Sequence, residues 1–512
     1  MRAAPSLPWA AAAQGPVTSV ALRVLHLAAG LAASGLLLAV IVPVSGKQPI
    51  VVFALLFVCA GATWMALTVR YEYSLAVLAL YLGLLDGFLK LKLDNQAAVL
   101  GRDVLFYAIV AGALARFAVS GRRVSWPPMS GWLLALLVVV LVQLWNPGNG
   151  SWAHSVSALR PHLEWLPLFF FGYVAMRSNR RLRGFLAVLL VVGAVNGAVS
   201  LVQYNLTADQ FAAWGPGYAA KVTGEGGSVS PRTFSDAEGN SRIRPFGLGS
   251  DIPFGGICGL IGLSAGIGLI AASRPQAILV VAPLLAMNVV AIVTSQSRTV
   301  IVSAAVLLIG FALLTTVSRQ RATRIIAMAV GLAVVVTIGL ALINSSKTTN
   351  RYANIAPDRA VGTVIKERRG TYSDLPRLLA HFPFGAGIGT VGPAAAEFGG
   401  PGNKGLSGES QFNFLLLEVG IPGLIVFTLF QLRVVGLALR RLRRVEDPQS
   451  RLLLAACAAP LIGFVANWIT GVTTVSTPNS PYFYFIAGVL AWWLITALSP
   501  RHAVGEHPLV AS

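Results

Sequence analysis

The chain has 512 residues, of which 55% are hydrophobic and only 11% are charged, whereas soluble domains usually have about 25% charged residues. This composition excludes a soluble globular protein. The net charge of +20 does not indicate nucleic acid binding, because the basic residues form short clusters between apolar runs, as the positive-inside rule expects of cytoplasmic loops.

About fourteen apolar runs are candidate transmembrane helices, because roughly 20 mostly apolar residues are needed to cross a bilayer. In chain order they are 22–44, 50–69, 73–89, 103–120, 131–146, 162–177, 184–204, 252–272, 276–294, 299–317, 324–344, 411–433, 452–470 and 481–499. The runs 73–89 and 131–146 are the shortest, so a pair of re-entrant segments is an alternative. The sequence therefore predicts one integral membrane domain over 1–512, an all-α polytopic helical bundle of about 12–14 transmembrane helices.

Arginines fall in alternate loops between these runs, which gives the expected orientation. The arginines of one side are Arg122, Arg123, Arg177, Arg180, Arg181, Arg183, Arg274, Arg319, Arg321, Arg324, Arg433, Arg440, Arg441, Arg443, Arg444, Arg451 and Arg501. By the positive-inside rule this side is cytoplasmic, and an even number of spans places both termini there. The opposite, extracytoplasmic side carries two long loops, 205–251 and 345–410, where we expect the functional residues.

The segment from His381 to Gly423 reads HFPFGAGIGTVGPAAAEFGGPGNKGLSGESQFNFLLLEVGIPG. Its glycines and prolines exclude a regular helix, while the residues after Phe412 are apolar enough to enter a bilayer. We therefore expect the junction, with the acid Glu409, at a membrane surface. The spacing G-x-G-x-x-G at 387–392 has no preceding strand, so it does not indicate a dinucleotide site. The three cysteines lie in apolar runs and indicate no metal site; we expect neither metal nor cofactor.

The pattern HxPFGxGxGT, a variable loop and the helix sequence FLLLEVGIPG resemble the O-antigen ligase and O-antigen polymerase superfamily of bacterial envelope membrane proteins. In this chain the pattern starts at His381, and Glu418 is the acid of the helix sequence. Ligases of the superfamily usually carry a His-Asn pair where this chain has Glu409-Ser410. Glu-Ser at this place is more similar to the exopolysaccharide polymerase branch.

The resemblance implies a metal-independent glycosyltransferase that polymerises undecaprenyl-diphosphate-linked oligosaccharide on the outer face of the bacterial cytoplasmic (inner) membrane. A second glycan is the acceptor, membrane lipids surround the bundle, a chain-length regulator is an expected partner, and nucleic acid is not. One alternative is an O-antigen ligase that moves the glycan to lipid A core or another envelope acceptor. An alternative from another class is a transporter or flippase for lipid-linked sugars, which would place ionisable groups at mid-membrane beside paired broken helices.

Among the arginines outside the cytoplasmic clusters, those singled out at the expected outer ends of helices are Arg160, Arg242, Arg244 and Arg298. We expect them to bind the diphosphate of the donor, because a guanidinium donates paired hydrogen bonds to phosphate oxygens and keeps its charge. The segments SRIRPFGLGSDIPFGG and SQSRTV also resemble arginine-containing elements of the superfamily. The alternative is that each arginine reaches lipid phosphates or pairs with a nearby acid such as Glu164 or Asp251.

Glu409 is the expected catalytic base, because glycosyl transfer requires a group that takes the proton from the acceptor hydroxyl. The alternative is that Glu409 only caps the helix that follows it. We expect His381 to be a packing residue, and Glu418 to face the bundle interior and pair with a polar neighbour. Asp86 also lies on an apolar background, and the sequence leaves its role open.

Overall fold

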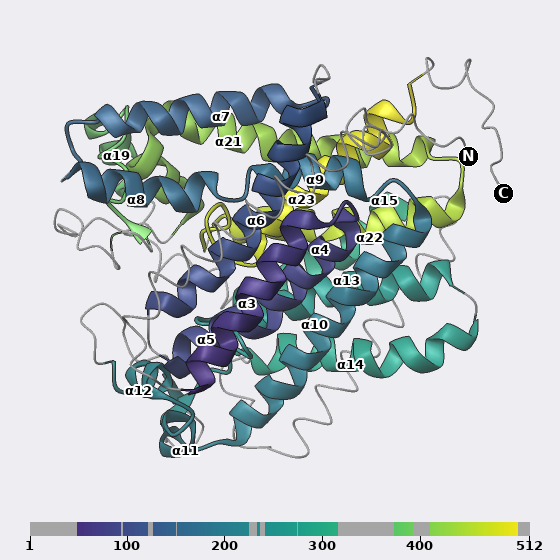
Figure 1. The fold of residues 1–512 in the computed structure, drawn as a ribbon, viewed down its shortest axis with the longest axis horizontal. Helices are drawn as coiled ribbons and strands as arrows, with labels where there is room; N and C mark the ends of the chain where they lie inside the picture. The colour runs from purple at the N-terminus through teal and green to yellow at the C-terminus, as the bar shows by residue number, and fades with distance from the viewer. Residues whose placement is uncertain are drawn as a thin grey trace.

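The computed structural model describes most of the chain as a helical bundle (Figure 1). The described residues are 49–93, 96–120, 126–149, 151–224, 233–235, 241–273, 275–315, 373–392, 395, 410–469 and 471–499. Glu409, most of the loop 345–410 and the runs 22–44 and 324–344 lie outside them. The predicted all-α membrane fold is confirmed, because almost every described element is a helix.

The elements of the first half are α3 Pro49–Leu67, α4 Tyr71–Leu80, the π-helix η2 Tyr81–Leu85, α5 Asp86–Leu93, α6 Gln96–Ser120, α7 Ser130–Val142, η3 Gln143–Trp145, α8 Trp152–Leu163, α9 Pro167–Ala175, α10 Asn179–Asn205, α11 Ala208–Ala212 and α12 Pro216–Thr223. Those of the second half are β1 Thr233–Ser235, β2 Ser241–Ile243, α13 Phe254–Ala272, η4 Pro275–Ala277, α14 Ile278–Thr294, α15 Arg298–Thr315, α19 Leu375–His381, α21 Gln411–Arg441, η6 Leu442–Arg444, α22 Pro448–Asn467, α23 Asn479–Ala491 and η7 Trp492–Thr496.

Within the described residues, 6 helices are long and apolar enough to cross a membrane. They are Tyr71–Leu93, Asn179–Asn205, Phe254–Ala272, Arg298–Thr315, Gln411–Arg444 and Pro448–Asn467. The protein is therefore a membrane protein. The short run at 73–89 belongs to the first of these helices, because α4, η2 and α5 follow one another without a break.

Two parts of the chain differ from the sequence-based expectation. The run 162–177 is not one helix: α8 ends at Leu163, a turn follows, and α9 starts at Pro167, because proline lacks the N–H of a helix interior but fits a first turn. In the loop 205–251, the hairpin of β1 and β2 was not predicted, since strands of three residues are too short to show an alternating pattern.

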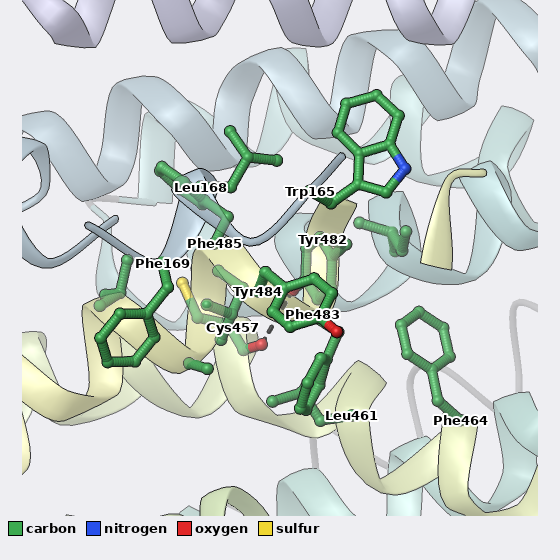
Figure 2. Packing of buried hydrophobic residues seen from close by; sticks show 14 of the residues in the cluster. Trp165, Leu168, Phe169, Cys457, Leu461, Phe464, Tyr482, Phe483, Tyr484 and Phe485 are labelled. Atoms are coloured by element: carbon green, nitrogen blue, oxygen red, sulfur yellow. Dashed lines mark hydrogen bonds between the residues drawn. The ribbon is translucent and has the colours of Figure 1, made fainter. Parts of the chain in front are cut away.

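Aromatic residues of α23 pack among buried side chains of α9 and α22 (Figure 2). The hydroxyl of Tyr482 donates to the carbonyl of Cys457 on α22 at 2.8 Å. The ring of Phe485 contacts that of Phe185 on α10 in a tilted arrangement, with 4.7 Å between ring centroids. In a bilayer such close packing and buried hydrogen bonds hold helices together, because lipid tails are as apolar as the side chains.

The arginine-bearing helix ends lie together at one end of the bundle. Asn179 at the start of α10 donates to Asp447 before α22 at 2.9 Å, and Arg441 at the end of α21 donates to the carbonyl of Leu494 after α23 at 3.2 Å. We call this end of the bundle the arginine end. The opposite end, where α8, α13, α15 and α21 begin, is called the loop end.

A pH prediction follows from Asp447, the N-cap of α22. Hydrogen bonds from the hydroxyl and amide of Ser450 and from Asn179 lower the pKa of Asp447 from 3.8 to about 2. A depressed pKa means that the carboxylate stabilises the fold above about pH 4 and that this contribution is lost as the pH falls towards 2. We expect the difference in thermal midpoint between wild type and Asp447→Asn to shrink from pH 5 to pH 2.5. A constant difference would contradict the assignment.

Candidate functional site at the loop end

Three acids and two arginines form a charge cluster in the loop half of the bundle. Arg102 on α6 lies 3.2 Å from Asp103, 3.3 Å from Glu164 and 3.9 Å from Asp86. Arg160 on α8 lies 2.6 Å from Asp103 and 3.5 Å from Glu164. Only the Arg160 side chain reaches appreciable solvent, at 29% exposure, whereas Glu164 is 2% exposed. These charges are tolerated inside a membrane helix bundle because they pair with one another.

A π-helical turn and an asparagine position Asp86 in the charge cluster. The turn η2 ends directly before Asp86, and its Gly83 carbonyl accepts a 2.9 Å hydrogen bond from the side-chain amide of Asn196 on α10. Such π-turns inside α-helices are frequent at functional sites, since the extra residue rotates the side chains that follow. Asp86, whose role the sequence left open, therefore pairs with Arg102.

Glu418 holds the glycine-rich segment 384–392 against the bundle. Its carboxylate accepts hydrogen bonds from the amides of Gly389 at 2.6 Å and Val391 at 2.8 Å, and it lies 3.4 Å from Nε2 of His162. Glu418 is 1% exposed. The prediction that it faces the interior beside a polar neighbour is confirmed, and the carboxylate fixes a loop that has no regular secondary structure of its own.

The same segment is fixed at its other end by a kink in α21. Gly420 has φ 67°, in the left-handed region that glycine tolerates, and the amide of Ile421 donates to Pro383 O at 2.8 Å. The side-chain amide of Gln143 donates to Phe384 O at 2.9 Å. The start of the segment is therefore held by η3 and by the kink of α21.

The helix α8 joins the charge cluster to the glycine-rich segment. It carries Arg160 of the charge cluster and His162, which contacts Glu418. The ring of His162 stacks on Phe414 of α21 with 5.6 Å between centroids. His154, also on α8, lies 3.2 Å from the carbonyl of Gly389. Phe414 is one turn after Ser410, so the last turn of α8 lies beside the first turn of α21.

The segment that carries Arg242 and Arg244 lies against the same part of the bundle. Arg242 lies on β2, directly opposite Phe234 of β1 in the antiparallel pair of strands. Gly249, further along this segment, packs against Gly87. A Cβ on residue 87 would lie only 2.4 Å from the carbonyl carbon of Gly249. Gly87 follows Asp86 directly, so this segment adjoins the charge cluster.

The first turn of α13 brings this segment near the start of α15. A Cβ at Gly255 would lie 3.1 Å from the amide of Gly247, and one at Gly256 would lie 2.8 Å from Ser295. Arg298 is the first residue of α15. The residues that follow Arg244 and those that precede Arg298 therefore contact one turn of one helix at the loop end.

The predicted site residues thus have different outcomes. Arg160 is paired with Asp103 and Glu164, which is the alternative that the sequence left open. The segments of Arg244 and Arg298 meet on α13, as described above. Glu409 lies outside the described residues, but its neighbour Ser410 caps α21, because its hydroxyl accepts from the amide of Asn413 at 3.1 Å.

Sequence reasoning missed Arg102, Asp103 and His162, which the structure places at the centre of the site. A signal for the first two was present, since a charged pair at the start of an apolar run is costly in a membrane and implies partners. The position of His162 beside Glu418 depends on contacts between residues far apart in the chain, so the sequence pattern did not reveal it.

No protein-family model matches the chain, and no curated protein shows a significant match.

Proposed function

We propose that this protein is a metal-independent glycosyltransferase that extends lipid-diphosphate-linked oligosaccharide at the loop end of its bundle. The observation that carries the proposal is the position of α8. This helix carries the partly exposed Arg160 of the charge cluster, and it also carries His162, which touches the carboxylate that holds the glycine-rich segment 384–392. Phe414 in the first turn of α21, shortly after Glu409-Ser410, stacks on His162 of the same helix α8.

In the proposed reaction the acceptor hydroxyl attacks the anomeric carbon of the lipid-linked sugar. The bond between that carbon and the diphosphate oxygen breaks, the linkage is inverted, and Glu409 takes the proton of the hydroxyl. Arg160, Arg242, Arg244 and Arg298 stabilise the negative charge of the departing diphosphate, which removes the need for a divalent cation.

The placement in the membrane is part of the same proposal. The arginine end would face the cytoplasm by the positive-inside rule, so the loop end would open to the outer face of the bacterial cytoplasmic membrane, where undecaprenyl-diphosphate-linked glycans are displayed. Extension of the glycan is preferred over ligation to lipid A core because Glu409-Ser410 stands where ligases have a His-Asn pair.

The residue roles are tested with purified protein, a synthetic lipid-diphosphate oligosaccharide and a chelator. We expect Glu409→Gln and Arg298→Gln each to lower the turnover number at least about 100-fold, the usual effect of losing a catalytic base or a charge-stabilising donor. Exposed Arg180 at the arginine end supplies the control, Arg180→Gln, with unchanged turnover. Full activity in both loop-end variants would defeat the assigned roles.

The charge cluster also favours a second candidate, a transporter for lipid-linked sugars. Ionisable groups inside the bundle are typical of transporters, as are helices interrupted within the membrane, and here the break between α8 and α9 directly adjoins Glu164. A transporter would move the lipid-linked glycan across a vesicle membrane without changing its mass, whereas the transferase would change it.

A further inference from the structure

A hollow of about 450 Å³ opens at the arginine end, far along α21 from the site described above. It lies between the last turns of α21 and the start of α7, which run side by side (Figure 1). Its walls include Arg433, Arg440, Arg441 and Arg444 of α21 and η6, together with Leu429 and Trp132. We call it the arginine hollow, and the proposed transfer reaction does not use it.

The arginine hollow is strongly cationic. A guanidinium keeps its charge at any relevant pH, and no acidic side chain lines the hollow among the residues that the structure describes. Arg441 is held in place by its hydrogen bond to Leu494 O, while Arg433, Arg440 and Arg444 are exposed. The four guanidinium groups around the hollow repel one another, and a bound anion would reduce this repulsion.

The side of the arginine hollow that faces the loop end is apolar. Leu429 and Leu432 are each 46% exposed, and both line the hollow together with Trp132. At 1.5 Å per residue, the lining runs about 22 Å along the helix from Leu429 to Arg444. Apolar and cationic surfaces are therefore continuous along one groove, which suits an amphiphile with an anionic head.

Gly436 lines the arginine hollow between Arg433 and Arg440. A Cβ at this position would meet nothing within 4 Å, so the space above the glycine is open. The volume of the arginine hollow falls within the range of about 300–1,000 Å³ that is usual for small-molecule sites.

We propose that the arginine hollow binds the phosphate headgroup of an anionic phospholipid from the surrounding leaflet. The arginines donate paired hydrogen bonds to phosphate oxygens, and an acyl chain lies along Leu429 and Leu432. Basic pockets between membrane helices are the kind of surface that recognises such headgroups. This inference goes beyond the proposed transferase activity and stands independently of it.

Native mass spectrometry of the full-length protein in detergent tests the proposal, with phosphatidylglycerol, phosphatidylcholine and inorganic phosphate each titrated in turn. We expect saturable binding of phosphatidylglycerol, and at least tenfold weaker binding to Arg440→Gln/Arg444→Gln. Gly436→Phe fills the hollow and keeps every charge, so it should weaken binding to the same extent. Arg70 directly precedes α4, whose Glu72 lies 3.3 Å from Arg181 at the start of α10, so it belongs to the same end as Arg180. The double variant Arg70→Gln/Arg180→Gln removes these two exposed arginines and should bind like wild type.

Three outcomes would overturn the proposal. Equal binding of phosphatidylcholine would show that apolar contact alone holds the lipid. Full displacement of phosphatidylglycerol by millimolar inorganic phosphate would show an anion site that does not recognise a lipid. Wild-type affinity in Gly436→Phe, or an equal loss in Arg70→Gln/Arg180→Gln, would place the binding outside the arginine hollow.

Discussion

Replacing Arg102 by methionine is expected to destabilise the purified protein by about 3–5 kcal/mol, the usual cost of removing one partner from a buried ion pair. The substitution leaves Asp86, Asp103 and Glu164 with Arg160 as the one remaining cation of the charge cluster. Methionine is close to arginine in length, so the lost charge rather than lost volume dominates. The measurement is the thermal unfolding midpoint in detergent, followed by tryptophan fluorescence.

Two further variants separate the charge effect from a general effect of substitution. Arg180→Met removes an exposed arginine at the other end and should leave the midpoint nearly unchanged. The double variant Arg102→Met/Glu164→Gln removes one buried carboxylate as well, so it should recover part of the loss. If the double variant is less stable than Arg102→Met alone, the charge cluster is not held together in the way described.

Replacing Glu418 by alanine is expected to release the glycine-rich segment 384–392 and to abolish most of the proposed activity. The amides of Gly389 and Val391 would lose their acceptor, and each buried unsatisfied amide costs about 1–3 kcal/mol. Glu418→Gln keeps one acceptor oxygen and should show an intermediate effect. Hydrogen–deuterium exchange of residues 385–392 reports the release directly.

Exposed Glu446 provides the matched control for this experiment. Glu446→Ala should leave both the exchange of residues 385–392 and the turnover unchanged. Glu418 acts through the backbone it holds, so it is a positioning residue, and exchange in this segment should rise even in protein that remains folded. Unchanged exchange in Glu418→Ala would refute its role as the clamp.

The helical fold follows from the sequence because the length of apolar runs is set by the thickness of the bilayer. Where the structure departs from the expectation, a local feature outweighs hydropathy. Pro167 starts a new helix inside a run that is apolar throughout, and Gly420 kinks α21 within another. Hydropathy is averaged over many residues, so it is little affected by a single proline or glycine. It therefore predicts the existence of a helix more accurately than the position of a break within it.

The candidate site was predictable in part. Glu418 was expected to pair in the interior, because an acid on an apolar helix needs a partner, but the sequence could not name His162 as that partner. Arg160 was expected to bind a ligand or to pair with an acid such as Glu164, which lies four residues further along the chain. Its ion pair with Asp103 forms only when α6 and α8 are brought together. Residue type indicates that a charge needs a partner, while the partner depends on the tertiary fold.

The most direct test of the central claim uses the protein reconstituted into vesicles that contain a lipid-diphosphate oligosaccharide. After incubation with chelator present, the lipid-linked glycans are extracted and their masses are measured. The account predicts a ladder of longer lipid-linked glycans that is absent with Glu409→Gln protein. Glycans of unchanged mass that have crossed to the opposite leaflet would contradict it and establish the bundle as a transporter.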